Sequence, residues 1–215
     1  MNSNREDYLK VLYSEGGIDK FVSNKLLAEH LNVAPGSVSE MLTKLSKAGL
    51  TEFVAYKGSK LTEYGAEVCM KIIRRHRLWE VFLMNKLNYT WREAHEDAHL
   101  LEHISSERMI ERLDEFLGYP ECCPHGESIP RDKVCVDDDT NLFTLDCLEV
   151  GDTARVLKIV EDGDLMDYVQ SRGFKIGQDV LVVSKGSYEG LIKFEQLGQL
   201  IELSHKAATQ IFVKK

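Results

Sequence analysis

The amino-acid sequence predicts an α+β protein in which helices fill the first part of the chain and a small β-barrel follows. Three observations support this fold class. Apolar residues recur at helical spacing as far as residue 117, residues from 151 onward alternate between apolar and polar, and a linker-like stretch over 129–141 separates the two patterns. We therefore expect three domains: residues 1–73, a helical domain of residues 74–140 that includes the linker, and residues 141–215.

The first domain is expected to begin with three short helices. Ser3 and Glu6 fit a capping box that opens a helix over residues 4–15, and two glycines at 16 and 17 end it. Ser23 can cap a second helix, residues 32–36 form a tight connection, and a third helix closes at residues 48–49. Two helices joined by about four residues make a helix-turn-helix.

A hairpin follows these helices. Residues 50–56 read as a strand, 57–59 as a turn and 60–62 as the returning strand, which together form the wing of a winged helix. Residues 20–75 hold nine Lys or Arg against five Asp or Glu, so this region can face phosphates although the whole chain has a net charge of −8. The alternative is a small three-helix domain with a hairpin and an outer face that is merely soluble.

In the DNA-binding interpretation, eight polar side chains of the third helix and the wing are expected to face the bases or the phosphates. Helix residue Thr43 faces outward together with the residues expected nearest the bases, Ser37, Ser39 and Glu40. The phosphate contacts are expected from Lys44, Lys47, Lys57 and Lys60.

The second domain is expected to contain three helices, over residues 62–86, from the capping box Thr90 and Glu93 onward, and over 106–117 with Gly118 as the stop. His76 and Glu80, four residues apart, project from one side of the first of them. Helices that are apolar on one side often pair with a copy of themselves, so we expect a two-fold dimer.

The second of these helices carries a face of metal-ligating side chains. His95, His99 and His103 recur every four residues, and Glu102 lies beside the last. Residues 76–140 hold fifteen Asp or Glu against seven Lys or Arg, together with five of the seven histidines, which suits cations. A loop with two prolines adds Cys123 and His125, whereas the adjacent Cys122 cannot point at the same centre. The sequence therefore predicts a metal site built from several helices and this loop.

Other interpretations of the same residues exist. His95, Glu96 and His99 fit the H-E-x-x-H pattern of zinc proteases, in which the glutamate activates water. Residues 96–99 also fit half of a di-iron site, but no second half is present in the sequence. Two blander alternatives are surface histidines on an acidic helix and a constitutive DNA-binding protein with a structural zinc site.

The last domain reads as a five-stranded barrel of about 70 residues. Its expected strands include residues 151–160, 177–184 and 191–194, and residues 164–172 are expected to form one short helix. No apolar run approaches the ~20 residues of a membrane span, and the N-terminus lacks the apolar segment of a signal peptide, so a cytoplasmic location is expected. Five cysteines, an odd number, indicate free or metal-bound thiols rather than a disulfide framework.

Taken together, the motifs resemble those of one known family. Glu-Asp-Tyr at residues 6–8, Arg-His-Arg-Leu at 75–78, Leu-Glu-His at 101–103 and Cys-Pro-His-Gly at 123–126, in this order, resemble the diphtheria toxin repressor family, and within it the manganese- and iron-responsive streptococcal regulators of the MtsR, ScaR and SloR type. The resemblance covers essentially the whole chain. It implies a homodimeric repressor, not an enzyme, that binds palindromic operators of metal-uptake genes when Mn(II) or Fe(II) is bound, with Zn(II) binding possible in vitro, and it implies that the last domain is SH3-like, of the FeoA type.

The resemblance also implies the ligands of two metal sites. One would use Glu80, Cys123, His125 and, from the last domain, Glu161. The other would use Asp7, Glu102 and His103, with His76, His95 or His99 nearby. In manganese-selective relatives the position of His99 is commonly Glu, and that of Lys10 can be a ligand Glu. Both are missing here, which makes softer metals more plausible.

Overall fold

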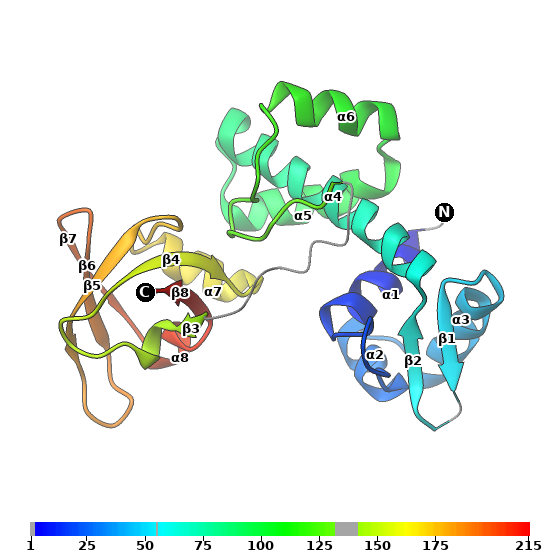
Figure 1. Cartoon of the computed structure of the whole chain (residues 1–215), viewed down its shortest axis with the longest axis horizontal. Helices are drawn as coiled ribbons and strands as arrows, with labels where there is room; N and C mark the ends of the chain where they lie inside the picture. Colours follow the sequence, from blue (N-terminus) through cyan, green and yellow to red (C-terminus); the bar gives the residue numbers. More distant parts are fainter. Residues whose placement is uncertain (1–2, 55, 132–141) are drawn as a thin grey trace. The chain divides into compact units, whose positions relative to one another are not determined.

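The computed structural model describes residues 3–54, 56–131 and 142–215 (Figure 1). The chain divides into two compact units. The first holds the N-terminal residues as far as His76 together with His99–Glu111, and the second holds Arg77–Ala98, Arg112–Ile129 and the C-terminal residues. The domain boundaries expected at residues 73 and 140 stay predictions, and most of the expected linker lies outside the described residues.

The first three helices are α1 (Ser3–Ser14), α2 (Asn24–Leu31) and α3 (Pro35–Lys47), and α2 and α3 form the helix-turn-helix. The predicted cap of α2 is confirmed, because Leu26 N donates to Ser23 Oγ over 3.3 Å. Asn32 takes a left-handed conformation after α2, and Pro35 opens α3 at a position where no backbone donor is needed. Each helix turns leucines and other apolar side chains into one core, which includes Leu9, Leu12, Leu27, Val38, Leu42 and Leu45.

The wing is the antiparallel pair β1 (Thr51–Val54) and β2 (Gly58–Leu61). The expected turn at residues 57–59 is wrong in part, because Gly58 and Ser59 already belong to β2. Ser59 exchanges two backbone hydrogen bonds with Val22, of 2.8 and 3.0 Å, and this extra pairing draws the chain into the sheet. Gly58 is required there: its φ is +108°, and a Cβ atom would lie 1.9 Å from the carbonyl oxygen of Val22.

Three further helices confirm the predicted order: α4 (Glu63–Leu87), α5 (Trp91–Ile104) and α6 (Glu107–Phe116). The capping box before α5 is present. Thr90 N and Glu93 N each bond the other residue's side chain, over 2.9 and 3.3 Å. Across the described part of the chain, no helix is both long and apolar enough to cross a bilayer.

The C-terminal residues form one antiparallel sheet of order β3-β8-β4-β5-β6-β7. The strands are β3 (Phe143–Thr144), β4 (Thr153–Ile159), β5 (Asp179–Lys185), β6 (Ile192–Gln196), β7 (Gln199–Leu203) and β8 (Ile211–Lys214). Five strands were expected, and the two-residue β3 is the addition. The predicted helix is α7 (Gly163–Gln170), and two short elements that were not predicted are η1 (Leu145–Cys147) and α8 (His205–Ala208).

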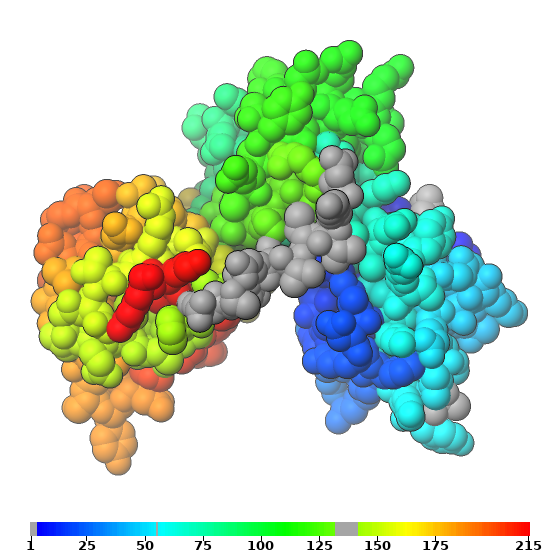
Figure 2. Space-filling model, viewed as in Figure 1, coloured from blue at the N-terminus to red at the C-terminus, as the bar shows by residue number. Residues whose placement is uncertain are grey.

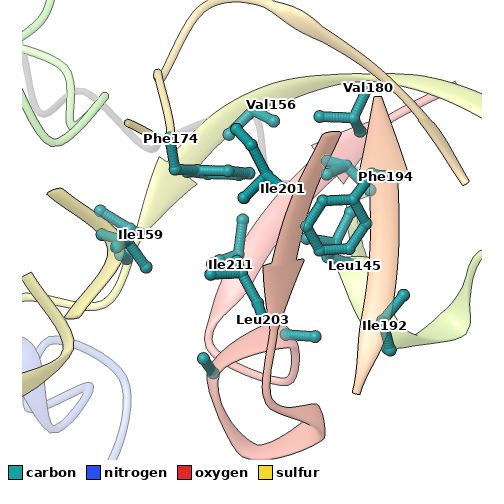
Figure 3. Packing of buried hydrophobic residues seen from close by; sticks show 14 of the residues in the cluster. Leu145, Val156, Ile159, Phe174, Val180, Ile192, Phe194, Ile201, Leu203 and Ile211 are labelled. Carbon is teal, nitrogen blue, oxygen red and sulfur yellow. The ribbon is translucent and has the colours of Figure 1, made fainter. Parts of the chain in front are cut away.

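The strands of this sheet pack their buried apolar side chains into one hydrophobic core (Figure 3). Phe174 and Phe194 meet edge to face with ring centroids 6.2 Å apart, among the side chains of Val156, Ile201 and Ile211. A register shift between Val156 and Lys158 breaks the alternation of β4 and returns Ile159 to the core. The loop between β5 and β6, light orange, protrudes from the surface of its unit (Figure 2).

Candidate metal centres and DNA-binding surface

The first cluster of metal-ligating side chains lies in the N-terminal unit and joins two helices. α1 supplies Asp7, and the end of α5 supplies His99, Glu102 and His103, whose ligand atoms all lie within 4.8 Å of one another. Residues 99, 102 and 103 are three and four positions apart, so they share one face of α5. The structure thus brings the three expected ligands Asp7, Glu102 and His103 together and places His99 beside them.

Glu102 is the buried centre of this cluster. One carboxylate oxygen, Oε2, lies 2.7 Å from His76 Nδ1, and the other, Oε1, lies 3.3 Å from His99 Nδ1 and 3.4 Å from His103 Nε2. Burial is the largest influence on the pKa of Glu102 and raises it, but the contacts with His76 and His99 and the charge of Lys10 together lower this pKa well below its usual range. Glu102 is therefore a carboxylate that can act as a ligand.

Asp7 and His103 supply the observation that tests the fit of a metal ion. His103 Nε2 lies 3.3 Å from Asp7 Oδ1, and both atoms are buried without a hydrogen-bond partner among the described residues. On the other side of the ring, His103 Nδ1 lies 2.6 Å from Oε2 of the buried Glu6. Because a carboxylate accepts, Nδ1 donates, and in the tautomer with its single proton on Nδ1 the other nitrogen, Nε2, turns its lone pair toward Asp7. Facing lone pairs repel unless a cation lies between them, so these residues fit a divalent metal ion.

The second cluster lies in the other unit and consists of three buried side chains. Glu80 from α4 and Cys123 and His125 from the following loop offer ligand atoms within 4.8 Å of one another. His125 Nδ1 lies 3.3 Å from Glu80 Oε2 and 3.7 Å from Cys123 Sγ, while its buried Nε2 has no hydrogen-bond partner within the described chain. Burial, followed by the charge of Glu80, raises the pKa of Cys123 well above its ordinary value. A carboxylate, an imidazole and a thiol in one dry site fit a transition metal.

The loop of the second cluster is held by its backbone. Gly126 N donates to Cys123 O over 3.0 Å, and Ile159 N at the end of β4 donates to His125 O over 3.1 Å. Gly126 has a φ of +86°, and a Cβ atom there would lie 1.7 Å from the carbonyl oxygen of Leu157. The edge of the Trp91 ring meets the imidazole of His125 at a centroid distance of 5.6 Å. The two prolines expected to stiffen this loop therefore act together with contacts to β4 and α5.

The remaining predicted ligands separate between the clusters. His95 Nδ1 lies 3.3 Å from Glu80 Oε1 and 3.1 Å from Glu161 Oε1, so His95 and Glu161 adjoin the second cluster. His76 and His99 contact Glu102 of the first cluster. Cys122 is exposed, as expected of the neighbour of a buried ligand, and no disulfide forms among the cysteines that the structure describes, Cys69, Cys122, Cys123 and Cys147.

Two residues of the first cluster were missed as site residues in the sequence. Glu6 was assigned to a capping box with Ser3. The side chain of Ser3 lies outside the described part, and the carboxylate of Glu6 contacts His103. Lys10 places Nζ 3.0 and 2.9 Å from the two carboxylate oxygens of Glu102. Helical spacing carried a signal for both, because residues 6 and 10 are one turn apart and flank Asp7.

The predicted DNA-binding side chains form an exposed surface on α3 and the wing. The exposed members are Ser37, Ser39, Glu40, Thr43, Lys44, Lys47 and Lys57, and Lys60 is half-buried. Lys44 pairs with Glu40 at 2.6 Å and Lys60 with Glu52 at 3.1 Å. Within the described chain Lys47 and Lys57 make no ion pair, so these two cations can meet phosphates without first leaving a carboxylate.

The comparisons with known proteins agree with this geometry. Residues 1–59 match the iron dependent repressor, N-terminal DNA binding domain, residues 62–131 match the iron dependent repressor, metal binding and dimerisation domain, and residues 143–215 match the FeoA domain. A solved structure of the manganese regulator SloR is 36% identical in sequence, has a TM-score of 0.76 and is covered over 100% of both chains. The chain belongs to the diphtheria toxin repressor family of metal-dependent transcriptional repressors.

Two more relatives bear on the metal. A structure of ScaR with bound Zn²⁺ is 35% identical to this repressor, with a TM-score of 0.79 and coverage of 98% of this chain and 99% of that one. The iron-dependent repressor IdeR of Mycobacterium tuberculosis is 31% identical over 127 residues, which are 58% of this repressor and 54% of IdeR. The family consists of regulators, so the zinc protease interpretation is not supported. The structure agrees, because His95 and His99 contact different carboxylates and Glu96 is exposed.

Proposed function

We propose that this repressor is a homodimer that, loaded with Mn(II) or Fe(II), binds palindromic operators of metal-uptake genes in the cytoplasm. The observation that carries the proposal is the facing pair Asp7 Oδ1 and His103 Nε2, at 3.3 Å and without hydrogen-bond partners in the described residues. It links α1, a helix of the DNA-binding domain, to α5 of the metal-binding domain.

The position of α1 controls the recognition helix through packing. Tyr8, Leu9 and Leu12 of α1 are buried in the same core as Leu42 and Leu45 of α3. Because such cores are close-packed, α3 has to follow when α1 is held against α5. A bound divalent ion would join Asp7 of α1 to Glu102 and His103 of α5 and offset the negative charge of the two carboxylates. The side chains thereby favour the conformation that spaces two recognition helices for one operator.

The two donor sets favour different metals. Asp7, His99, Glu102 and His103 offer oxygen and nitrogen, which suit Mn(II) and Fe(II). Glu80, Cys123 and His125 include a thiol, which favours softer ions, and the Zn²⁺ bound by ScaR is consistent with zinc binding in vitro. Proposing Mn(II) or Fe(II) as the physiological effector also follows the manganese response of SloR and the iron dependence of IdeR.

The interface of the proposed dimer would contain apolar side chains that are exposed to solvent in the single chain. Leu100 and Ile104 of α5 and Met109 of α6 are 64%, 78% and 50% exposed. Residues of this kind on neighbouring helices suit a self-complementary two-fold contact. Dimerisation would present two copies of α3, as a palindromic operator requires.

The test is a DNA-binding titration on the full chain. Operators selected from a random DNA pool with the manganese-loaded protein would be labelled, and fluorescence anisotropy would be followed with Mn(II), with Fe(II) under anaerobic conditions and with a chelator. We expect Asp7→Ala to lose the metal response, whereas Asp179→Ala, an exposed aspartate on β5, keeps it. Equal DNA affinity with metal and with chelator in the unaltered protein would refute the proposed switch.

A further inference from the structure

The first metal cluster already contains a cation of the protein itself. The ammonium group of Lys10 lies 3.0 Å from Oε1 and 2.9 Å from Oε2 of Glu102, so it contacts both carboxylate oxygens. The Glu102 side chain is fully buried and that of Lys10 is only 23% exposed. A charge-assisted contact of this kind, with both partners shielded from water, is screened by salt much less than an ion pair on the surface.

The contact spans two helices that the proposed switch has to join. Lys10 and Asp7 are three residues apart and lie on one side of α1, so both side chains reach the end of α5. Asp7 brings a negative charge to the cluster, which requires a cation before it can approach Glu102. Lys10 brings a positive charge, which attracts Glu102 directly. Asp7 therefore favours the binding of a metal ion beside Glu102, whereas Lys10 opposes it.

We infer that Lys10 is a built-in counter-ion of the metal cluster, which holds α1 on α5 in the metal-free protein and sets the metal affinity by competing with the ion for Glu102. This inference rests on the proposed function of the cluster. A divalent ion bound to Asp7, His103 and Glu102 has to share Glu102 with the ammonium group, and the two positive charges repel each other. The repressor consequently responds at a higher metal concentration than the same ligands would set without Lys10.

The direction of each effect follows from the charges. In Lys10→Met the metal-free protein retains a buried carboxylate without its lysine, so the link between α1 and α5 weakens. The same change removes the competing cation and raises metal affinity. Because a hydrogen bond to a charged group is worth about 1.5–3 kcal/mol, we expect Lys10→Met to lower the dissociation constant for Mn(II) by about tenfold to a hundredfold.

The experiment compares Lys10→Met with Lys10→Arg and with Lys193→Met in the full chain. Lys193 pairs with Glu202 at 2.6 Å on the exposed side of the C-terminal sheet and is the matched control. The readouts are Mn(II) affinity by competition with a fluorescent chelator, and hydrogen exchange of the α1 amides in EDTA. We expect tighter Mn(II) binding and faster α1 exchange in Lys10→Met alone, and near-native behaviour in Lys10→Arg, which keeps the cation.

The outcomes separate this inference from the proposed function. If the unaltered protein binds Mn(II) and Lys10→Met matches it in affinity and in α1 exchange, Lys10 is not a counter-ion. If Lys10→Met binds Mn(II) more weakly and loses protection throughout its unit, Lys10 is only structural and the inference is overturned as well. If Mn(II) leaves the DNA affinity, followed by anisotropy as a third readout, unchanged in every variant, the proposed function fails, whereas tighter Mn(II) binding by Lys10→Met alone still supports the competition at Glu102.

Discussion

Replacing Glu6 by glutamine should weaken metal binding although Glu6 does not reach the metal position. Glu6 is 4% exposed, and its carboxylate accepts a hydrogen bond of 2.6 Å from His103 Nδ1. It therefore selects the ring form in which Nε2 is free to bind a metal. A glutamine has the same shape but can turn its NH₂ group toward Nδ1, which moves the ring proton to Nε2 and blocks the ligand atom.

The expected magnitude follows from the kind of bond that is lost. A buried hydrogen bond to a charged group contributes about 1.5–3 kcal/mol and a neutral one about 1 kcal/mol, so the loss is roughly 0.5–2 kcal/mol, or about two- to thirtyfold in affinity. Losses of about tenfold to a hundredfold are typical when the partner of a metal-binding histidine is replaced.

The assay is competition between the protein and a fluorescent Mn(II) chelator, with DNA anisotropy as a second readout. Glu15→Gln is a matched control, because Glu15 contacts His30 at 3.2 Å in the same unit but outside the cluster. Melting temperatures in EDTA would show whether either variant is misfolded. Manganese affinity within twofold of the unaltered protein in a well-folded Glu6→Gln would contradict the role given to Glu6.

Four further predictions follow from contacts described above. Gly126→Ala should disrupt the loop of the second cluster, because an alanine at this left-handed φ costs about 1–2 kcal/mol and its Cβ atom would clash with Leu157 O. The affinity of the second cluster for Cd(II), followed by the thiolate-to-cadmium absorbance, should fall at least about tenfold, while the first cluster keeps its Mn(II) affinity. Metal binding to the second cluster should release a proton and strengthen as pH rises, because the raised pKa of Cys123 leaves a neutral thiol that has to ionise; calorimetry in buffers of different ionisation enthalpy measures the release. Lys57→Ala removes one phosphate contact from each subunit of the proposed dimer, so it should lower the slope of log affinity against log salt by about 0.9 per subunit, or about 1.8 per dimer. Lys44→Ala, whose charge is already paired with Glu40, should lower the slope less. Glu96→Gln should leave metal and DNA affinity unchanged within about twofold, since this exposed side chain belongs to neither cluster; a large loss in either titration would contradict that assignment.

Helix positions could be predicted from the sequence because the signals are local. The capping box of Thr90 and Glu93 and the cap of Ser23 lie within one turn of the helix that they begin. The face shared by His99, Glu102 and His103 likewise follows from spacing alone. The part of the first cluster on α5 was therefore within reach of the sequence, and Asp7 came from the family resemblance, whereas Glu6 and Lys10 of α1 were missed.

The misassigned residues depend on contacts between distant parts of the chain. Gly58 and Ser59 resemble turn residues, but Ser59 pairs with Val22, which is far away in sequence. Glu6 fits a capping box equally well as a partner of His103, and only the approach of α5 decides between them. The pattern His95, Glu96 and His99 suggested one zinc site, whereas the fold assigns the two histidines to different carboxylates, which spacing on a single helix cannot show.

The bond between His125 O and Ile159 N has a consequence for shortened forms of the chain. Trp91, which meets the ring of His125, is itself 7% exposed because it is buried in the core of the C-terminal sheet. A protein cut before residue 141 would open the loop of Cys123 and His125 to water and leave an apolar indole uncovered, yet it would keep every side chain of the Asp7 cluster. Truncation would thus separate the two metal centres chemically, with the softer one lost and the harder one retained.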